Sequence, residues 1–492
     1  MSEVKVNKIS PRTNCGTVTL GDSGDTFTIP SGVTITNNGT QTGFGREGSV
    51  DWQTGSIKTA ATFTAANGEG YFVDTTSNVI TANLPAGSAG AIVAFSDYAR
   101  NFNTKKLTIS PNGSEKIGGV AAPLSLTIDG QALTLVYVDA TKGWINVQNA
   151  EDTEKGETAS YVAATGGNST ATSPCGNFKI HTFTGPGTLC VSSAGNASGN
   201  NQIEYIVVAG GGGGGGQYIA GGGGAGGLRF ASPSLAPATY PAKPLAAPTA
   251  ITATVQGYPI TVGGGGTGNN AAGDTDSTRG LTSTFSTITS TGGGAGKQDQ
   301  GPGNDTGQPG GSGGGGAGGN PGPAPNAYVR GLGNTPSVSP PQGEPGGSGN
   351  QTSPSPDGSN FSPGGPYAAG GGGGALAKGA DGIKPGGLGG NGGVGGGFPN
   401  AFGTSGQSSG GYYYFAGGGG GNASVCGGPP SPTSGTGGLG GGGAGAPNAN
   451  ATAGTANTGG GGGGTDSRPG PSAHAGGGGG SGIVIIRYKF QN

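Results

Sequence analysis

Nine runs of consecutive glycines, each four to seven residues long, recur between Ala209 and Ile483. Glycine has no side chain to bury and loses more conformational entropy on ordering than any other residue. Such runs therefore become ordered only where their amide groups find partners. This stretch either is disordered or folds through backbone hydrogen bonds instead of a hydrophobic core. The runs are Gly210–Gly216, Gly221–Gly224, Gly263–Gly266, Gly313–Gly316, Gly370–Gly374, Gly417–Gly421, Gly440–Gly443, Gly459–Gly464 and Gly476–Gly480.

Disorder is the first alternative, because 121 glycines and 34 prolines make up 155 of the 492 residues. Three observations argue against it. The stretch from Gly210 to Gly480 carries only eight basic and eight acidic residues, whereas disordered tracts usually carry high net charge. The runs have similar lengths, unlike those of flexible linkers. Strand-like segments, Ile203–Val208 and Ile483–Phe490, precede and follow the stretch.

An ordered alternative is the extended threefold helix of polyglycine II. It rises about 3.1 Å per residue and has no hydrogen bonds within one strand. Its N–H and C=O groups point outward, so neighbouring helices can bond laterally where no side chain intervenes. Collagen is excluded, because the continuous runs break a strict three-residue glycine period. We therefore expect a bundle of glycine helices, with the intervening polar segments as loops at its ends.

The order of segments at the edges of the glycine stretch carries a resemblance. Phe178–Thr184 is followed by Gly185-Pro186-Gly187, by Thr188–Val191 and by Ile203–Ala209, and the chain closes on Ile-Val-Ile-Ile-Arg-Tyr. Over residues 165–492 this order resembles the glycine-rich domain of bacteriophage tail-fibre tip adhesins. The resemblance implies a small β base, a polyglycine II sandwich and distal loops that contact a host receptor.

The first 45 residues are similar to the opening of tail-fibre-like virion proteins of cyanophages, in Val6–Arg12 and Gly21–Gly32. Apolar residues there alternate with threonine, a period of two that predicts short half-buried strands. Such strands are too short to bury a core within one chain, so we expect a homotrimer joined through residues 1–45. The alternating residues are Val18, Leu20, Phe27, Ile29, Val33 and Ile35.

Residues 46–149 have ordinary globular composition, with strand-like pieces about every ten residues and turn signals such as Asn67-Gly68 between them. This pattern predicts a small antiparallel β-sandwich, in which Trp52 and Trp144 are core or interface aromatics. Residues 150–170 read as a polar connector, and residues 171–492 form the glycine-rich adhesin domain. The predicted fold class is therefore all-β throughout.

The sequence offers little catalytic chemistry. The four cysteines have no metal-binding spacing, and pairing Cys175 with Cys190 fails if Gly185-Pro186-Gly187 forms a hairpin, so we expect free, mostly buried thiols. We expect both histidines, His181 and His474, to be structural. The acidic pairs of the distal half, Asp274 with Asp276 and Asp299 with Asp305, lie among polar loop residues. We expect no enzyme activity, no metal and no cofactor.

Charge and hydropathy exclude other classes of partner. A net charge of −2 with 9% charged residues provides no basic surface for nucleic acid. No hydrophobic stretch approaches the roughly 20 residues that span a bilayer. The opening residues do not resemble a signal peptide, so we expect assembly into a virion that is released by lysis.

Aromatic residues within the glycine stretch must either cap the bundle or lie in its loops, because glycine segments offer no core. Loops rich in Tyr, Ser, Gly and Asn are typical of adaptable recognition surfaces. The alternative is that the rings only pack over helix ends or against neighbouring subunits. The candidate receptor-binding residues are Tyr412, Tyr413, Tyr414, Phe415, Tyr218, Tyr328, Phe361, Tyr367 and Phe402.

Together these patterns predict a virion tail-fibre or tail-tip protein that attaches to a host-cell receptor, a glycan or an outer-membrane protein, and to other virion tail proteins. Two alternatives remain open. The chain could be a purely structural fibre or decoration protein, or a tailspike that degrades glycans with paired carboxylates.

Overall fold

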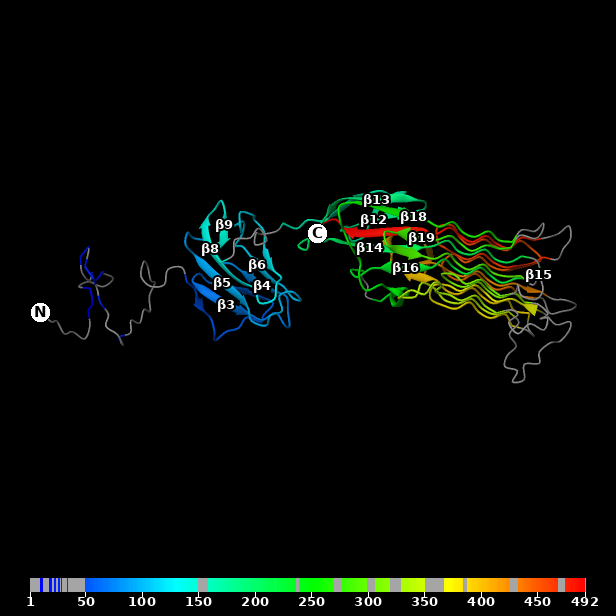
Figure 1. Ribbon diagram of the computed structural model, residues 1–492, viewed down its shortest axis with the longest axis horizontal. Helices are drawn as coiled ribbons and strands as arrows, with labels where there is room; N and C mark the ends of the chain where they lie inside the picture. Colours follow the sequence, from blue (N-terminus) through cyan, green and yellow to red (C-terminus); the bar gives the residue numbers. More distant parts are fainter. Residues whose placement is uncertain are drawn as a thin grey trace. The chain divides into compact units, whose positions relative to one another are not determined.

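The computed structural model describes two compact units, Met1–Glu157 and Thr158–Asn492 (Figure 1). Among the described residues there is no α-helix, so the predicted all-β fold is confirmed. Most of residues 1–45 lie outside the described part, so the N-terminal strands and the trimer stay predictions. The described residues are 9–11, 17–19, 22–23, 25–26, 28, 33, 49–148, 158–216, 218–235, 239–269, 276–298, 306–318, 329–349, 367–383, 387–424, 432–467 and 474–491.

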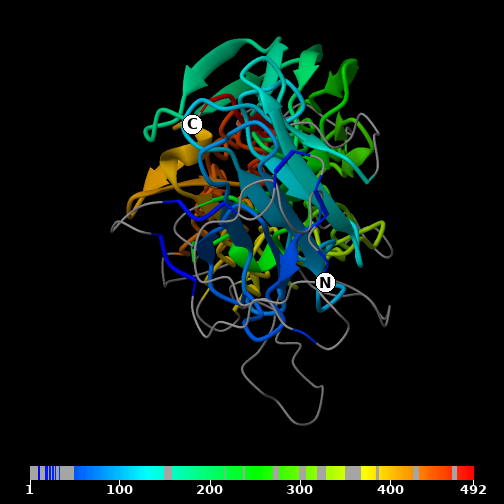
Figure 2. The same ribbon diagram turned by 90° about the vertical axis from the view of Figure 1, so that its left-hand side faces the viewer.

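The first unit consists of two sheets packed face to face, drawn in blue and cyan (Figure 2). Their facing side chains form one core that includes Phe95, Phe102 and the fully buried Trp144. Trp52 is 37% exposed and lies against Phe72, with ring centroids 4.9 Å apart. One sheet has the order β1 (Asp51–Trp52), β3 (Glu69–Val73), β5 (Ile92–Asp97), β8 (Ala132–Asp139), β9 (Gly143–Asn146); the other has the order β2 (Thr62–Thr64), β4 (Ile80–Asn83), β6 (Leu107–Ser110), β7 (Leu124–Leu126).

The prediction of an antiparallel sandwich is wrong, because both sheets are mixed. β1, β3 and β5 are parallel neighbours, as are β2, β4 and β6, and only the later strands pair antiparallel. From β1 to β6 the chain alternates between the two sheets. Each turn therefore leads to the opposite sheet, and the next strand of the same sheet runs in the original direction.

The second unit begins with a β base of two packed sheets. In the first, the opening strand β14 and the closing strand β28 are antiparallel neighbours, which agrees with the small β base that the resemblance implied. Residues 158–170, expected to belong to the connector, contain β10 and the start of β11 instead. The sheets are β11 (Ser169–Thr172), β12 (Phe178–Phe183), β28 (Ile483–Lys489), β14 (Gln202–Val208), β16 (Leu228–Ala231), with β17 (Ile251–Thr252) also on β14; and β10 (Val162–Thr165), β13 (Gly187–Ala194), β18 (Gly257–Thr261), β19 (Ser283–Phe285), β20 (Ile288–Ser290).

The central sheet of the base, which holds β14 and β28, buries both faces. Val207, Val484 and their neighbours pack against the sheet of β13 and β18. Ile206 and Ile485 face a second core on the other side. Small elements complete the unit: η2 (Lys243–Leu245), η3 (Asn400–Phe402), and the sheets β22 (Gly396–Phe398), β24 (Tyr412–Phe415), β23 (Gln407–Ser409); β15 (Tyr218–Ile219), β27 (Thr465–Ser467), β26 (Ala446–Pro447); and β21 (Tyr367–Ala368), β25 (Ala423–Ser424).

Beyond the base, extended segments run out and back many times as a bundle, here called the lattice (Figure 1). Its hydrogen bonds follow a period of three. Consecutive backbone amides along Gly210–Gly215 donate in turn to three neighbouring segments, 277–282, 475–482 and 220–227. Amides three positions apart therefore donate to the same segment. Carbonyls of this segment accept from three more, 263–269, 291–298 and 459–465. The acceptors of Gly210 to Gly215 are, in order, Leu281, Gly480, Gly224, Thr278, Gly477 and Gly221.

This pattern is the lateral bonding expected of polyglycine II helices. Segment 209–216 is surrounded on all sides, and a Cβ at Gly212 would overlap the carbonyl oxygen of Gly294. Outer segments tolerate side chains where they face solvent. In segment 388–395, every third residue, Leu388, Asn391 and Val394, is exposed. The two longest runs, Gly210–Gly216 and Gly459–Gly464, are buried throughout, whereas the interrupted segment 388–395 lies at the surface.

Candidate functional site

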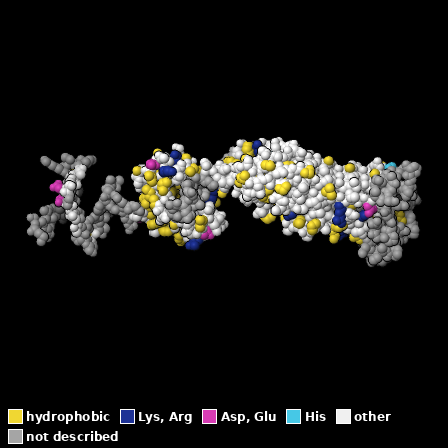
Figure 3. Space-filling model, turned by 45° about the horizontal axis from the view of Figure 1, so that its top comes forward, with side chains coloured by type: hydrophobic (Ala, Val, Ile, Leu, Met, Phe, Trp, Pro, Cys, Tyr) yellow, Lys and Arg dark blue, Asp and Glu magenta, His cyan; other side chains and the backbone are white. Residues whose placement is uncertain are grey.

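The end of the lattice remote from the base, here called the distal face, carries β15, β27 and the neighbouring β25 and β26 (Figure 1). The chain reverses there repeatedly, between described residues such as Asn269 and Asp276. Figure 3 shows few charged side chains on the visible surface of this unit.

Buried polar side chains lie where the glycine segments reach the distal face. The Asn269 amide donates to Gln298 Oε1 at 2.7 Å, and both side chains are buried. Next to Gln298, the buried Lys297 forms an ion pair of 2.9 Å with the half-exposed Asp276. Asp276 is therefore engaged by a cation. The polarity of these residues in the printed sequence gave no signal that they would be buried.

Residues Tyr412–Phe415, here called the tyrosine run, do not lie at the distal face. They form β24, the middle strand between β22 and β23, next to the base. Tyr412 and Tyr413 are half-buried and pack against the core beside the central sheet, and Phe415 is only 2% exposed. The run therefore packs against a side-chain core, whereas the sequence placed it over the ends of the glycine helices or in their loops.

The other candidate aromatics are distributed differently from the prediction. Phe402, at the end of η3, is 1% exposed and its ring lies 6.0 Å from that of Phe398. Tyr367 is buried with Ile219 and Ala369. Tyr328, Phe361 and the side chain of Tyr218 lie outside the described residues. Phe402, Phe415 and Tyr367 therefore lack the exposure that receptor contact requires.

A further aromatic core, not foreseen from the sequence, explains the burial of Phe402 and Phe415. The Phe398 ring lies 4.8 Å from Phe230 and 6.1 Å from Phe415. Beside it, Arg487 donates to Glu204 at 2.6 Å, and both side chains are 3% exposed. The Arg487 guanidinium also stacks on Phe178, 3.7 Å from the ring centroid. The sequence signal for this ion pair was one acidic residue, Glu204, in the opening strand-like segment and two basic residues, Arg487 and Lys489, in the closing one.

His181 is buried and structural in its contacts. Its Nδ1 lies 2.7 Å from the Gly166 carbonyl oxygen and its Nε2 lies 2.9 Å from the Tyr488 hydroxyl. The Tyr488 hydroxyl in turn meets both the N–H and the C=O of Ala164. Burial lowers the pKa of His181. These contacts join β10, β12 and β28.

Gly185-Pro186-Gly187 does not form the hairpin on which the argument about Cys175 and Cys190 depended. It leads from β12 in the central sheet to β13 in the other sheet, so these two strands do not pair with each other. Cys175 and Cys190 are free, but both are exposed, which corrects the expectation of buried thiols. A hydrogen bond with Ser173 lowers the pKa of the Cys175 thiol. Cys15 and Cys426 lie outside the described residues.

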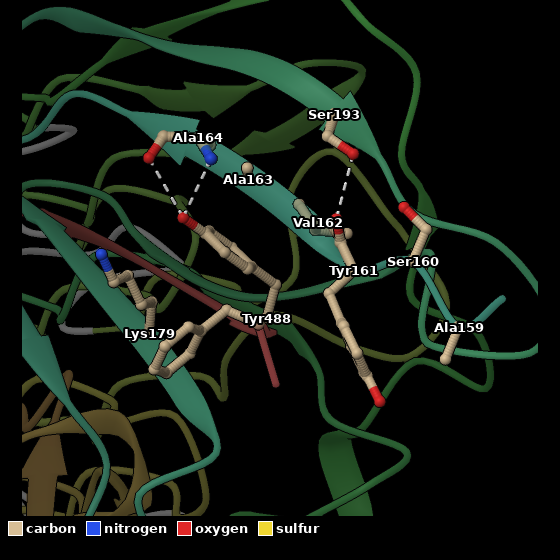
Figure 4. Close-up of a pocket in the computed structure, with 10 residues that line it drawn as sticks. Ala159, Ser160, Tyr161, Val162, Ala163, Ala164, Lys179, Ser193 and Tyr488 are labelled. Atoms are coloured by element: carbon tan, nitrogen blue, oxygen red, sulfur yellow. Dashed lines mark hydrogen bonds between the residues drawn. The ribbon is translucent and has the colours of Figure 1, made fainter. Parts of the chain in front are cut away.

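A groove of about 420 Å³ lies on the base, beside the first residues of the second unit (Figure 4). Tyr488 and Lys179 lie on one side, and Tyr161, Ser160 and Ala159 lie on the other. The Ser193 hydroxyl donates to the Tyr161 carbonyl oxygen at 3.1 Å. We call this cavity the Lys179 groove. Its residues are scattered through the sequence and form no recognisable motif.

The described residues contain no group of three or more His, Cys, Asp or Glu side chains that could hold a metal ion. A search of that same part of the chain finds no helix with the length and apolar character needed to cross a bilayer.

Comparison with known proteins bears on the second unit. A family model described as a glycine-rich domain matches residues 188–489. The chain belongs to this glycine-rich domain family. The match begins within β13 and ends at the last residue of β28, so it includes the lattice and most of the base. No curated protein matches the chain.

Proposed function

We propose that this glycine-rich domain protein is a virion tail-fibre or tail-tip protein that binds a host-cell receptor through its distal face. The observation that carries the proposal is the lattice. Its order comes from backbone hydrogen bonds, so the lattice does not need the residues between its segments to fill a hydrophobic core. Recognition residues concentrate on loops that a rigid scaffold positions.

The sequence at these reversals fits a recognition surface. Residues 350–366 carry Asn, Gln, Ser, Thr, Pro and one Phe, and residues 319–328 end in Tyr. Such compositions suit contacts with hydroxyl-rich or mixed surfaces. The receptor is a glycan or an outer-membrane protein. Residues 1–45 join three copies and attach them to other tail proteins.

The test uses the purified full chain and bacteria that are hosts of the phage encoding it. Fluorescently labelled protein should bind these cells, and excess unlabelled protein should slow adsorption of the virions. Virions should contain the chain by mass spectrometry. If the chain is in virions but neither binds cells nor slows adsorption, it is a structural component. Release of reducing sugar ends from host polysaccharide would instead establish a tailspike.

A matched pair of variants tests the distal face itself. Replacement of Tyr328 and Phe361 by Ser changes two sequence positions between lattice segments, and replacement of Val394 by Ser changes an exposed position on the side of the lattice. We expect the first variant alone to bind cells more weakly. Equal binding by both variants would contradict a receptor contact at these two residues.

A further inference from the structure

The Lys179 groove combines a cation, hydroxyl groups and aromatic rings at the base, away from the distal face. Its volume of about 420 Å³ lies within the range of sites that hold small molecules. Tyr161 and Phe490 supply partly exposed aromatic surface, and Ser160 and Ser193 supply hydroxyl groups. Such a set can contact the C–H face and the hydroxyls of one sugar ring.

The charge of the groove selects among such ligands. The Lys179 side chain is exposed, and its ammonium lies 5.4 Å from the centroid of the Phe490 ring. None of the residues that line the groove is acidic, and within the described part of the chain no carboxylate forms an ion pair with Lys179. An anionic group would neutralise Lys179.

The groove is also preformed. The Tyr488 hydroxyl is held by the backbone of Ala164 and by His181, and the Ser193 hydroxyl is bonded to Tyr161. β10, which carries Val162, pairs with β13 in one sheet, and β28, which carries Tyr488, pairs with β12 in the other. A site with fixed walls loses little entropy when a ligand binds.

We propose that the Lys179 groove binds an acidic monosaccharide, with the carboxylate on Lys179 and the ring against Tyr161 and Phe490. This site is separate from the receptor contacts proposed for the distal face. Its existence does not depend on the chain being an adhesin.

The test is a calorimetric titration of the full chain with sodium glucuronate at low ionic strength, compared with glucose and with sodium acetate. Glucuronate should bind at least about tenfold more tightly than either, because only it offers both the charge and the ring. Affinity should fall as salt is added, since the groove is open to solvent. Equal affinity for acetate would overturn the sugar part of the proposal, and equal affinity for glucose would overturn the role of the charge.

Two lysine variants separate the site from general effects. Lys179→Met keeps the side-chain stem and removes the charge, and should weaken glucuronate binding about tenfold or more. The control is Lys243→Met, since Lys243 also lies over an aromatic ring, 5.8 Å from the centroid of Tyr240, but outside the groove. It should leave binding unchanged. Unaltered binding by Lys179→Met, with both variants folded by circular dichroism, would refute the proposal.

Discussion

The lattice and the base of the second unit are stabilised by different interactions. In the base, side chains such as Phe398 and Ile485 fill the space between sheets, and each is fully buried. In the lattice interior, Gly212 and its neighbours leave no space for even one methyl group. Burial of apolar side chains stabilises the base, whereas hydrogen bonds between neighbouring backbone segments stabilise the lattice.

The two parts respond differently to substitution. A side-chain core loses stability when atoms are removed, because a cavity remains. A backbone lattice loses stability when atoms are added, because segments must separate and several hydrogen bonds break together. In the outer segments of the lattice, positions that face water should tolerate both the removal and the addition of side-chain atoms with little change in stability.

The largest effect is expected from removing a ring of the base. Phe398→Ala deletes the centre of a cluster that includes Phe230, Phe402 and Phe415. It should lower the free energy of unfolding of the second unit by about 3–5 kcal/mol. Urea unfolding, monitored by hydrogen exchange of the amides in β14 and β28, measures this loss of stability. Val394→Ala, on the outer lattice, is the control, and a similar loss there would contradict the distinction.

The lattice should show the reverse sensitivity at two adjacent glycines. A Cβ at Gly479 would overlap the Gly211 carbonyl oxygen, whereas a Cβ at Gly478 has its nearest atom 3.5 Å away. Gly479→Ala should cost about 1–3 kcal/mol. Gly478→Ala should be neutral or stabilising by up to about 1 kcal/mol, because alanine restricts the unfolded chain. Thermal unfolding of both variants decides this, and equal effects would mean that the lattice tolerates expansion.

Acidification should weaken the base through His181. Burial lowers its folded pKa below the usual 6.5, so the unfolded chain binds more protons as the pH falls. The stability it contributes is fully present above pH 6.5 and declines as the pH drops toward the folded pKa, by at most about 1.4 kcal/mol per pH unit. Urea titrations from pH 7.5 to pH 4.5 should show this slope, and His181→Gln should reduce it. The same slope in the variant would assign the effect to other groups.

The smallest effect is expected from a surface ion pair on the lattice. Lys378 lies 3.0 Å from Asp381, and the two side chains are 39% and 36% exposed. Exposed pairs contribute about 0.2–1 kcal/mol, so Lys378→Met should change the free energy of unfolding by no more than that. Thermal unfolding at low and high salt measures it. A larger change would show that charge, besides backbone bonding, supports the outer segments.

The parts of the fold that follow from periodicity were predictable. Continuous glycine indicated a lattice, and the apolar segments at residues 203–208 and 483–490 indicated a shared sheet, which β14 and β28 form. Strand pairing in the first unit was not predictable, because a turn such as Asn67-Gly68 reverses the chain without specifying which sheet receives it.

The place of the tyrosine run was missed for a physical reason. Its partner strand β22 consists of Gly396, Gly397 and Phe398, and glycine has little strand propensity. Without that partner visible in the sequence, Tyr412 to Tyr414 read as an isolated exposed loop. The Lys179 groove was missed because it joins residues near 160, 179 and 488, whose proximity follows only from the sheet order. The buried amides at the distal face, Asn269 and Gln298, carried no pattern either.

The period of three in the lattice bonds has a consequence for how such a chain can change its length. Inserting one or two residues in an interior segment would rotate every later amide toward the wrong neighbour. Inserting three residues restores the same set of neighbours after one full helical turn. Adding three residues to an outgoing segment and three to the segment that returns from it would lengthen that part of the lattice by about 9 Å. The lengths of interior segments in viable variants should therefore differ in multiples of three residues, whereas the lengths of the connections between segments can differ by any number of residues.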